Sequence, residues 1–189
     1  MIYDPIIHHR RSIRLKGYDY SSAGGYFITI CTLDRKSIFG TIVGHEMRLS
    51  RAGEIARECW LEIPNHFPKV QLDEFIVMPD HMHGIIIIPS SLVGAQHVVP
   101  PPRLNQFQKI VPQSLSVIIR SFKAATTNRI NQLRRTPGGR VWQRNYYEHI
   151  IRDEDSLFRI RKYIAENVMR WVFKQSLPSE EILKPPLHK

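Results

Sequence analysis

The chain has little cysteine and no apolar run that approaches the length of a membrane span. Its two cysteines, Cys31 and Cys59, stand far apart and belong to no motif, which is typical of buried free thiols in a reducing cytosol. The first five residues have neither the basic start nor the apolar core of a signal peptide. Internal repeats and low-complexity segments are also lacking. With 189 residues, we expect one well-packed cytoplasmic domain without a membrane segment.

Acidic residues are scarce beside the basic ones. Lysine and arginine total 27 against 17 aspartates and glutamates, so the formal net charge is +10 with histidine neutral. A charge this far from zero favours a polyanionic partner, and nucleic acid is the first such partner to consider. The alternative from charge alone is a basic surface that has no such partner.

The most informative segment is residues 75–88, where His81 and His83 interrupt an apolar run. The run reads as two buried strands joined by a short turn at residues 79–80. Because successive side chains of a strand alternate between its faces, both imidazoles are expected on the same face. Two imidazoles at this spacing can share one metal ion, so the sequence predicts a metal site. The alternative is a hydrogen-bonded, inert pair of histidines.

Apolar periodicity and breaker residues divide the rest of the chain into strands and helices. Helices are expected after the N-cap residues Ser50 and Ser114, and a third begins at the acidic residues 153–156 and runs to about Phe173. The order is strand, helix, strand, strand, helix, strand, helix. It predicts an α+β domain with a ferredoxin-like split βαβ arrangement, an antiparallel sheet and helices mainly on one face. Strands are expected over residues 26–33, 71–78, 81–88 and the second half of 141–151, with a short hairpin over 39–49.

Composition sets the expected domain limits. Residues 1–21 are basic and aromatic and predict an N-terminal arm, whereas the proline-containing end of the chain, residues 174–189, predicts a tail. Between them, residues 22–173 form the expected folded domain. Residues 90–113 inside it contain several prolines, serines and a glycine, which predicts a long loop.

The expected last helix carries Tyr163 and Asn167 four positions apart, so both lie on one helix face. A phenol hydroxyl and an amide oxygen placed in this way can both point at a metal ion held elsewhere. An amide oxygen also suits a hard divalent ion. The alternative is that Tyr163 is a half-buried core aromatic and Asn167 a surface amide.

Four segments match one known family in the same order along the chain. They are Gly-Gly-Tyr-Phe-Ile-Thr-Ile-Cys-Thr at 24–32, Met-Pro-Asp-His-Met-His at 78–83, Val-Trp-Gln-Arg-Asn-Tyr-Tyr-Glu-His-Ile-Ile-Arg at 141–152 and Tyr-Ile-Ala-Glu-Asn at 163–167. Together they resemble the REP-associated tyrosine transposases, which belong to the single-tyrosine HUH endonuclease superfamily. The resemblance covers about residues 22–172, and it is the order of the segments on a basic chain that makes it specific.

The resemblance implies a role for each residue of the site. His81 and His83 would be ligands of a divalent metal, Mg²⁺ or Mn²⁺, with Asn167 as the third ligand and Tyr163 as the nucleophile. The family often has a proline directly after this asparagine, whereas the chain has Val168, a difference that concerns the end of the helix and not the chemistry. Two rival nucleophiles, Tyr146 and Tyr147, lie in a segment that has no helical partner for a ligand.

The implied activity is cleavage and transfer of single-stranded DNA, often presented beside a hairpin, in transposition or mobilisation of repeat elements. The tyrosine would attack a phosphodiester in line and leave a covalent 5′-phosphotyrosine and a free 3′-hydroxyl. Relatives include monomers and dimers, so either state is expected. Charge and position predict DNA contacts at Arg120, Lys123, Arg140, Trp142 and Arg144. Of these, Trp142 could either stack on a base or pack in the core.

Two other functions stay open from the sequence. A non-catalytic nucleic-acid-binding module would keep the basic surface and leave the histidines and tyrosine unused, but the Lys/Arg-Gly-Phe strand motif of an RRM is missing. A metal-dependent phosphodiesterase that uses water would need more acidic or histidine ligands than the sequence supplies.

Overall fold

The computed structural model describes residues 23–90 and 114–176, and every structural statement below refers to these residues. The predicted arm over residues 1–21 lies outside the described residues. So do nearly all of the predicted loop over 90–113 and the tail from residue 177 onward.

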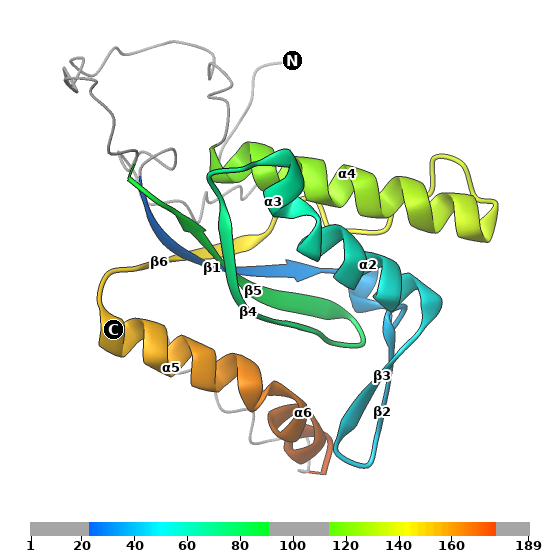
Figure 1. Ribbon diagram of the computed structural model, residues 1–189. Coiled ribbons are helices and arrows are strands. Elements are labelled where there is room, and N and C mark those ends of the chain that lie inside the picture. Colours follow the sequence, from blue (N-terminus) through cyan, green and yellow to red (C-terminus); the bar gives the residue numbers. More distant parts are fainter. Residues whose placement is uncertain (1–22, 91–113, 177–189) are drawn as a thin grey trace, which may run out of the picture.

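A four-stranded antiparallel sheet forms the centre of the structure (Figure 1). Its strands lie in the order β4-β5-β1-β6, so that β5 and β1 are central and flanked on both sides. The chain leaves β1, crosses to the edge strand β4, turns back into β5 beside β1, and crosses again to β6 at the other edge. This order confirms the predicted α+β class with a ferredoxin-like split βαβ arrangement. The strands are β1 (Gly24–Cys31), β4 (Gln71–Val77), β5 (His81–Ile88) and β6 (Tyr147–Ile151).

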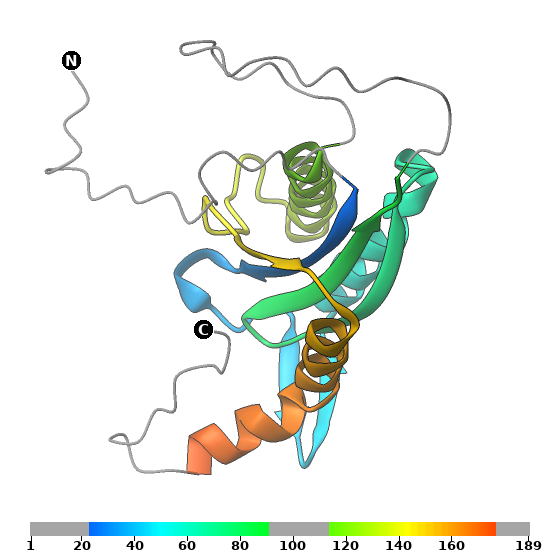
Figure 2. The same cartoon turned by 90° about the vertical axis from the view of Figure 1, so that its left-hand side faces the viewer.

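Helices cover the two faces of the sheet unequally. The two crossover helices, α2 (Arg51–Leu61) and α4 (Leu115–Arg134), lie together over one face, and they contact each other as well as the sheet (Figures 1 and 2). The helix α5 (Glu154–Ala165) lies against the opposite face. The helices are therefore mainly on one face, as predicted, and α5 is the exception that matters for the site.

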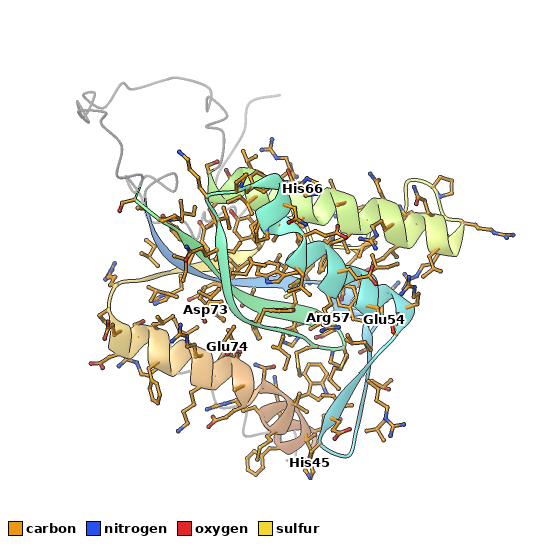
Figure 3. All side chains as sticks on the ribbon, in the orientation of Figure 1. His45, Glu54, Arg57, His66, Asp73 and Glu74 are labelled. Atoms are coloured by element: carbon orange, nitrogen blue, oxygen red, sulfur yellow. The ribbon has the colours of Figure 1, made fainter. Side chains whose placement is uncertain are left out.

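The smaller elements connect this framework. A separate two-stranded hairpin extends away from the sheet, with His45 at its tip (Figure 3). A short helix that was not predicted follows α2 and contains Pro64 in its first turn. No helix in the described ranges is both long and apolar enough to cross a membrane. These elements are η1 (Leu33–Arg35), β2 (Gly40–Val43), β3 (Glu46–Leu49) and α3 (Ile63–His66).

Of the two residues predicted as N-caps, Ser50 caps its helix and Ser114 does not, and a further cap forms at Asp153, where a helix start was predicted. The Ser50 hydroxyl accepts a hydrogen bond from the backbone N–H of Gly53 at 3.2 Å, and the Asp153 carboxylate accepts one from Ser156 at 2.6 Å. Ser114 stands at the start of α4, but its side chain makes no capping hydrogen bond. The sequence therefore predicted correctly that α4 begins after Ser114, but the predicted capping hydrogen bond of the Ser114 side chain does not form.

The predicted last helix is broken, contrary to the expectation of one helix to about Phe173. The helix α5 ends at Ala165, Glu166 has φ −82° and ψ 0°, and α6 (Asn167–Ser176) continues in a new direction (Figure 2). Apolar spacing persists across the junction, so periodicity alone does not reveal the break. The break places Asn167 at the first position of α6.

Alternation along β5 separates two cores. Met82 and Ile86 face the large core beneath α2 and α4, whereas Ile85 faces a small core beneath α5. At Gly84, an added Cβ would lie 2.3 Å from Cζ2 of Trp60, so glycine is needed for the indole to pack directly on the strand. The strand thus carries tight packing on one face and its histidines on the other.

Candidate active site

His81 and His83 lie on the same face of β5, as the alternation predicts. Their Nε2 atoms are 3.1 Å apart and their ring centroids 4.7 Å apart. Across β1, His81 is opposite Cys31 and His83 is opposite Thr29. Both rings are buried on the side of the sheet that faces α5 and α6.

The other nitrogen of each ring is held by a neighbour. Nδ1 of His81 lies 2.5 Å from Oδ1 of Asp80, and Nδ1 of His83 lies 2.8 Å from the Thr29 hydroxyl. An imidazole anchored through Nδ1 is oriented for ligation through Nε2. Both rings are therefore held through Nδ1, with their Nε2 atoms close to each other.

The electrostatics keep the site ready for a cation. Burial, together with the nearby imidazole of His81 and the guanidinium of Arg35, lowers the pKa of His83 well below its ordinary value, so this ring is neutral. Burial opposes ionisation of Asp80, but its hydrogen bond with His81 and the charges of His81 and Arg35 together leave the pKa of Asp80 below its ordinary value. A neutral imidazole and an ionised carboxylate behind its neighbour are the usual states around a bound metal.

Tyr163 of α5 lies over the histidine pair within the same chain. Its ring centroid is 5.2 Å from that of His83 and 6.0 Å from that of Phe27, which itself stacks on His83 at 5.3 Å. The guanidinium of Arg170 lies 5.5 Å from the centre of the Tyr163 ring. The phenol is half-buried, between the small core and a cation.

The start of α6 lies over the other histidine. Asn167 is 5% exposed, and Trp171, one turn further along, has its ring centroid 5.7 Å from that of His81. Asn167 is thus a buried polar side chain at the helix junction and not the surface amide of the alternative interpretation. Sequence reasoning missed Thr29, Arg170 and Trp171 as neighbours of the site, since only the strand register and the helix break bring them there.

The donor atoms fit a shared metal ion. Two nitrogens bound to one ion at about 2.0–2.1 Å lie roughly 3.0–3.4 Å apart, which includes the 3.1 Å observed between the Nε2 atoms. The same separation allows a hydrogen bond between the rings, whose proton a metal would replace. Within residues 23–90 and 114–176, no three His, Cys, Asp or Glu side chains form a group that could hold a metal. Within the part of the chain that the structure describes, a third protein ligand would therefore have to be of another kind, such as an amide oxygen.

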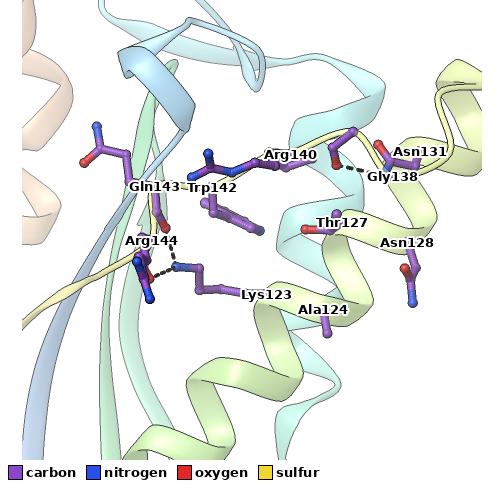
Figure 4. Close-up of a pocket in the computed structure, with 12 residues that line it drawn as sticks. Lys123, Ala124, Thr127, Asn128, Asn131, Gly138, Arg140, Trp142, Gln143 and Arg144 are labelled. Carbon is purple, nitrogen blue, oxygen red and sulfur yellow. Dashed lines mark hydrogen bonds between the residues drawn. The ribbon is translucent and has the colours of Figure 1, made fainter. Parts of the chain in front are cut away.

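The predicted DNA contacts lie elsewhere, around an open groove of about 460 Å³ between α4 and the segment that leads into β6 (Figure 4). Arg140 and Arg144 line this groove and are exposed, and neither forms an ion pair with any described residue. Arg120 is exposed on α4 but does not line the groove. Within residues 23–90 and 114–176, none of these three exposed arginines forms an ion pair.

Lys123 and Trp142 have structural contacts in the same groove. The Lys123 ammonium donates to the backbone carbonyl of Gln143 at 2.6 Å, and burial lowers the pKa of Lys123. Trp142 is 5% exposed and packs against Phe39 and Phe122 at centroid distances of 5.0 and 5.6 Å. The packing alternative therefore holds for Trp142, and its ring offers no free face for a base.

The two rival tyrosines lie on opposite faces of the sheet. Tyr147 is opposite Thr29 across β1, on the histidine face, and burial raises its pKa. Tyr146 packs against the large core on the other side. Of the two tyrosines, only Tyr147 lies on the same face of the sheet as His83. The two residues are separated by β1, in which Thr29 lies between them.

Comparisons with known proteins agree with this geometry. No protein-family profile matches the chain. A functionally uncharacterised protein of Haemophilus influenzae is 45% identical over 170 residues, which cover 89% of this chain and 93% of that protein. A candidate REP-associated tyrosine transposase of the same organism is 26% identical over 153 residues, covering 80% of this chain and 74% of the relative.

A solved structure shares the fold. It is a REP-associated tyrosine transposase bound to a REP hairpin, with a TM-score of 0.58 and 17% identity, covering 85% of this chain and 74% of that one. The antiparallel sheet and its helices thus define the class as an α+β domain with the fold of this transposase structure. The chain belongs to one family with its 45% identical relative from Haemophilus influenzae, and at 26% identity it is also similar to the REP-associated tyrosine transposase of that organism.

Proposed function

We propose that this protein cuts single-stranded DNA and forms a covalent 5′-phosphotyrosine through Tyr163, in transposition or in mobilisation of repeat elements. The observation that carries the proposal is the contact between Tyr163 and His83 inside one chain, with the Nε2 atoms of His83 and His81 only 3.1 Å apart. This contact brings a phenol to the buried imidazole pair, where a metal ion and a nucleophile could act on one phosphate.

We assign His81, His83 and Asn167 as ligands of one divalent cation, Mg²⁺ or Mn²⁺. When bound, the ion would neutralise charge on the phosphoryl oxygens and on the departing oxygen. Thr29 and Asp80 would hold the two imidazoles in place, because each contacts the nitrogen that does not face the partner ring. Asn167 would add an amide oxygen from the start of α6.

The chemistry requires one substitution at phosphorus. The Tyr163 oxygen loses its proton and attacks the phosphorus, and the bond from phosphorus to the 3′ oxygen breaks. That oxygen takes a proton and leaves as a 3′-hydroxyl, while the 5′ end stays on the tyrosine. A later attack by a 3′-hydroxyl reverses the bond changes and rejoins DNA without an external energy source. Arg170, beside the ring, would stabilise the phenolate and the phosphate.

The charge distribution supports a DNA substrate. No aspartate or glutamate occurs between His81 and Tyr147, and the unpaired Arg120, Arg140 and Arg144 lie within that stretch. Arginine contacts to phosphates supply most non-specific affinity for DNA. Lys123, in contrast, would act by fixing the backbone of the groove. The hairpin bound to the solved relative supports hairpin DNA as the presented form.

A covalent-adduct assay tests the proposal. The full chain is incubated with Mn²⁺ and a labelled oligonucleotide that carries a hairpin and a single-stranded flank, and adducts are separated under denaturing conditions. Tyr163→Phe should abolish both adduct and cleavage while changing DNA affinity less than about threefold, since most affinity comes from arginines.

Tyr147→Phe is the matched control, because it removes a hydroxyl from the same face of the sheet. It should keep the adduct. An adduct that persists in Tyr163→Phe and disappears in Tyr147→Phe would move the nucleophile to β6. Cleavage without any adduct in the wild-type protein would identify a hydrolase that uses water, and binding without cleavage would identify a non-catalytic module.

A further inference from the structure

We infer that Arg35 is a positioning residue of this site, which orients His81 through the carboxylate of Asp80. The inference deepens the proposed function and rests on it, because the purpose of the orientation is ligation of a cation by Nε2 of His81. Nothing in the sequence motif points to Arg35, which lies between β1 and the β2–β3 hairpin.

The contacts form a continuous chain from the surface to the imidazole. Nε of Arg35 lies 3.1 Å from Oδ2 of Asp80, and the other carboxylate oxygen, Oδ1, lies 2.5 Å from Nδ1 of His81. Nη1 of Arg35 also donates to Sγ of Cys31 at 2.9 Å. Cys31 is directly opposite His81 in the sheet, so both contacts of the guanidinium lead to the same end of the site.

The backbone at Arg35 is held in an unfavourable conformation. Asp34 and Arg35 both have φ of 55°, in the left-handed region that residues other than glycine rarely adopt. Two such residues in succession are unfavourable, and they persist only where the surroundings impose them. This conformation directs the Arg35 side chain back toward the turn that precedes β5.

The surroundings that impose it belong to the turn that carries Asp80. The backbone N–H of Thr32 donates to the carbonyl of Asp80 at 2.9 Å, and the N–H of Phe39 donates to the carbonyl of Pro79 at 3.0 Å. Residues 32–39 are therefore tied at both ends to residues 79–80. Arg35 is thus a strained residue between two anchored backbone positions, and its side chain contacts the carboxylate of the anchored Asp80. Strained residues held in this way are typical of functional sites.

The carboxylate needs this second contact for a physical reason. The side chain of Asp80 is only 8% exposed, so water cannot hold its Oδ2 when Oδ1 is bound to the imidazole. A guanidinium on Oδ2 stops the carboxylate from rotating and favours its ionised form. Because the Arg35 side chain is 50% exposed, solvent screens the pair and its effect must be moderate.

The experiment is a double-mutant cycle on the full chain, read by isothermal titration with Mn²⁺ alone. Asp80→Ala should weaken Mn²⁺ binding about 10- to 100-fold, as loss of a carboxylate behind a metal-bound histidine does. Arg35→Ala should weaken it about two- to fivefold. The double variant should be no weaker than Asp80→Ala, because Arg35 acts only through that carboxylate.

Arg161→Ala is the matched control. It breaks an ion pair of the same kind, with Arg161 47% and Asp73 11% exposed, that ties α5 to β4 (Asp73 is labelled in Figure 3). Arg161→Ala should change thermal stability about as much as Arg35→Ala does, but it should leave the affinity for Mn²⁺ unchanged. Arg35→Lys keeps the charge but cannot reach both Asp80 and Cys31, so it should restore only part of the affinity.

A second measurement reads the histidine without any metal. Long-range ¹⁵N–¹H spectra should show His81 with its proton on Nδ1 in the wild type and a mixture of both tautomers in Arg35→Ala. Unchanged affinity and an unchanged tautomer in Arg35→Ala would overturn the inference, as would a loss that persists in the Asp80→Ala background. Failure of the wild type to bind Mn²⁺ would instead refute the proposed function, while the spectra would still test the link from Arg35 to His81.

Discussion

The two faces of the central sheet are made by the same strands and have opposite characters. On the face beneath α2 and α4, alternate residues of β1 and β5 join a large apolar core around Trp60. On the face beneath α5, the fully buried apolar cluster is small, and the same strands continue into His81, His83 and Thr29. Burial of polar rings is costly, and the large core on the other side of the strands offsets that cost.

Charge does not follow this division. Near α4, Arg140 and Arg144 form no ion pair within the described chain, but Arg129 of α4 pairs with Glu58 and Glu62. On α5 and α6, Glu166 pairs with both Lys162 and Arg170. The comparison teaches that the large core lies on one side of the sheet and the proposed chemistry on the other.

The largest expected effect separates chemistry from stability. The double substitution His81→Ala, His83→Ala should lower Mn²⁺-dependent DNA cleavage by at least about 10³-fold, because a bound metal contributes several kcal/mol to the transition state. In urea unfolding, this double variant should lose less stability than Trp60→Ala, because both partners of the 3.1 Å contact between the imidazoles are removed together. Metal-dependent cleavage that survives the substitution would break the comparison.

The next effect measures the large core. Trp60 is fully buried and packs on Phe75 and Phe122, so Trp60→Ala should lower the free energy of unfolding by about 3–5 kcal/mol. Ile160→Ala, in the small core, should cost about 2 kcal/mol, at the low end for its type, because few apolar neighbours surround it. Urea unfolding measures both, and equal losses would show that the two cores contribute alike.

The third prediction concerns Gly84, a residue of β5 next to His83 whose side-chain position is on the large-core face. Gly84→Ala places a methyl group 2.3 Å from the Trp60 ring, and overpacking of this kind costs about 1–3 kcal/mol. The methyl points away from the histidines, so Mn²⁺ affinity of the folded protein should stay within about twofold of the wild type. A large loss of metal affinity at unchanged stability would show that the faces are coupled through the strand.

The smallest effect concerns the groove. Arg144→Ala should weaken DNA binding a few-fold and reduce the slope of log affinity against log salt by about one, as loss of a single phosphate contact does. Cleavage at saturating DNA should not change. Arg57→Ala, on the exposed side of α2, is the control with the same change in charge and should leave the slope unaltered (Figure 3).

Local features of the chain were predictable because they depend on neighbours in the sequence. The strands, the crossover helices and the N-caps at Ser50 and Asp153 follow from periodicity and capping chemistry. The common face of His81 and His83 follows from the two-residue period of a strand. The family followed from the order of short segments, and the comparisons support it.

Other features required the packed chain. The break at Glu166 leaves the apolar spacing intact, and it decides that Asn167 is buried and that Trp171 faces His81. The burial of Trp142 depends on Phe39 and Phe122, which are distant in the sequence. The sequence shows which side chains are apolar or charged, but it does not predict which of them are buried or bonded to other residues in the fold and so cannot contact a ligand.

By itself, the sequence determined the α+β framework and the pair of imidazoles on one strand face, because both depend on interactions of near neighbours along the chain. Tertiary structure alone decided which groups hold those imidazoles: Thr29 through the register of β1 with β5, and Arg35 through a strained turn fixed to residues 79–80. These contacts join residues about fifty positions apart. Their geometry exists only when the sheet has formed, so no local pattern in the sequence records it.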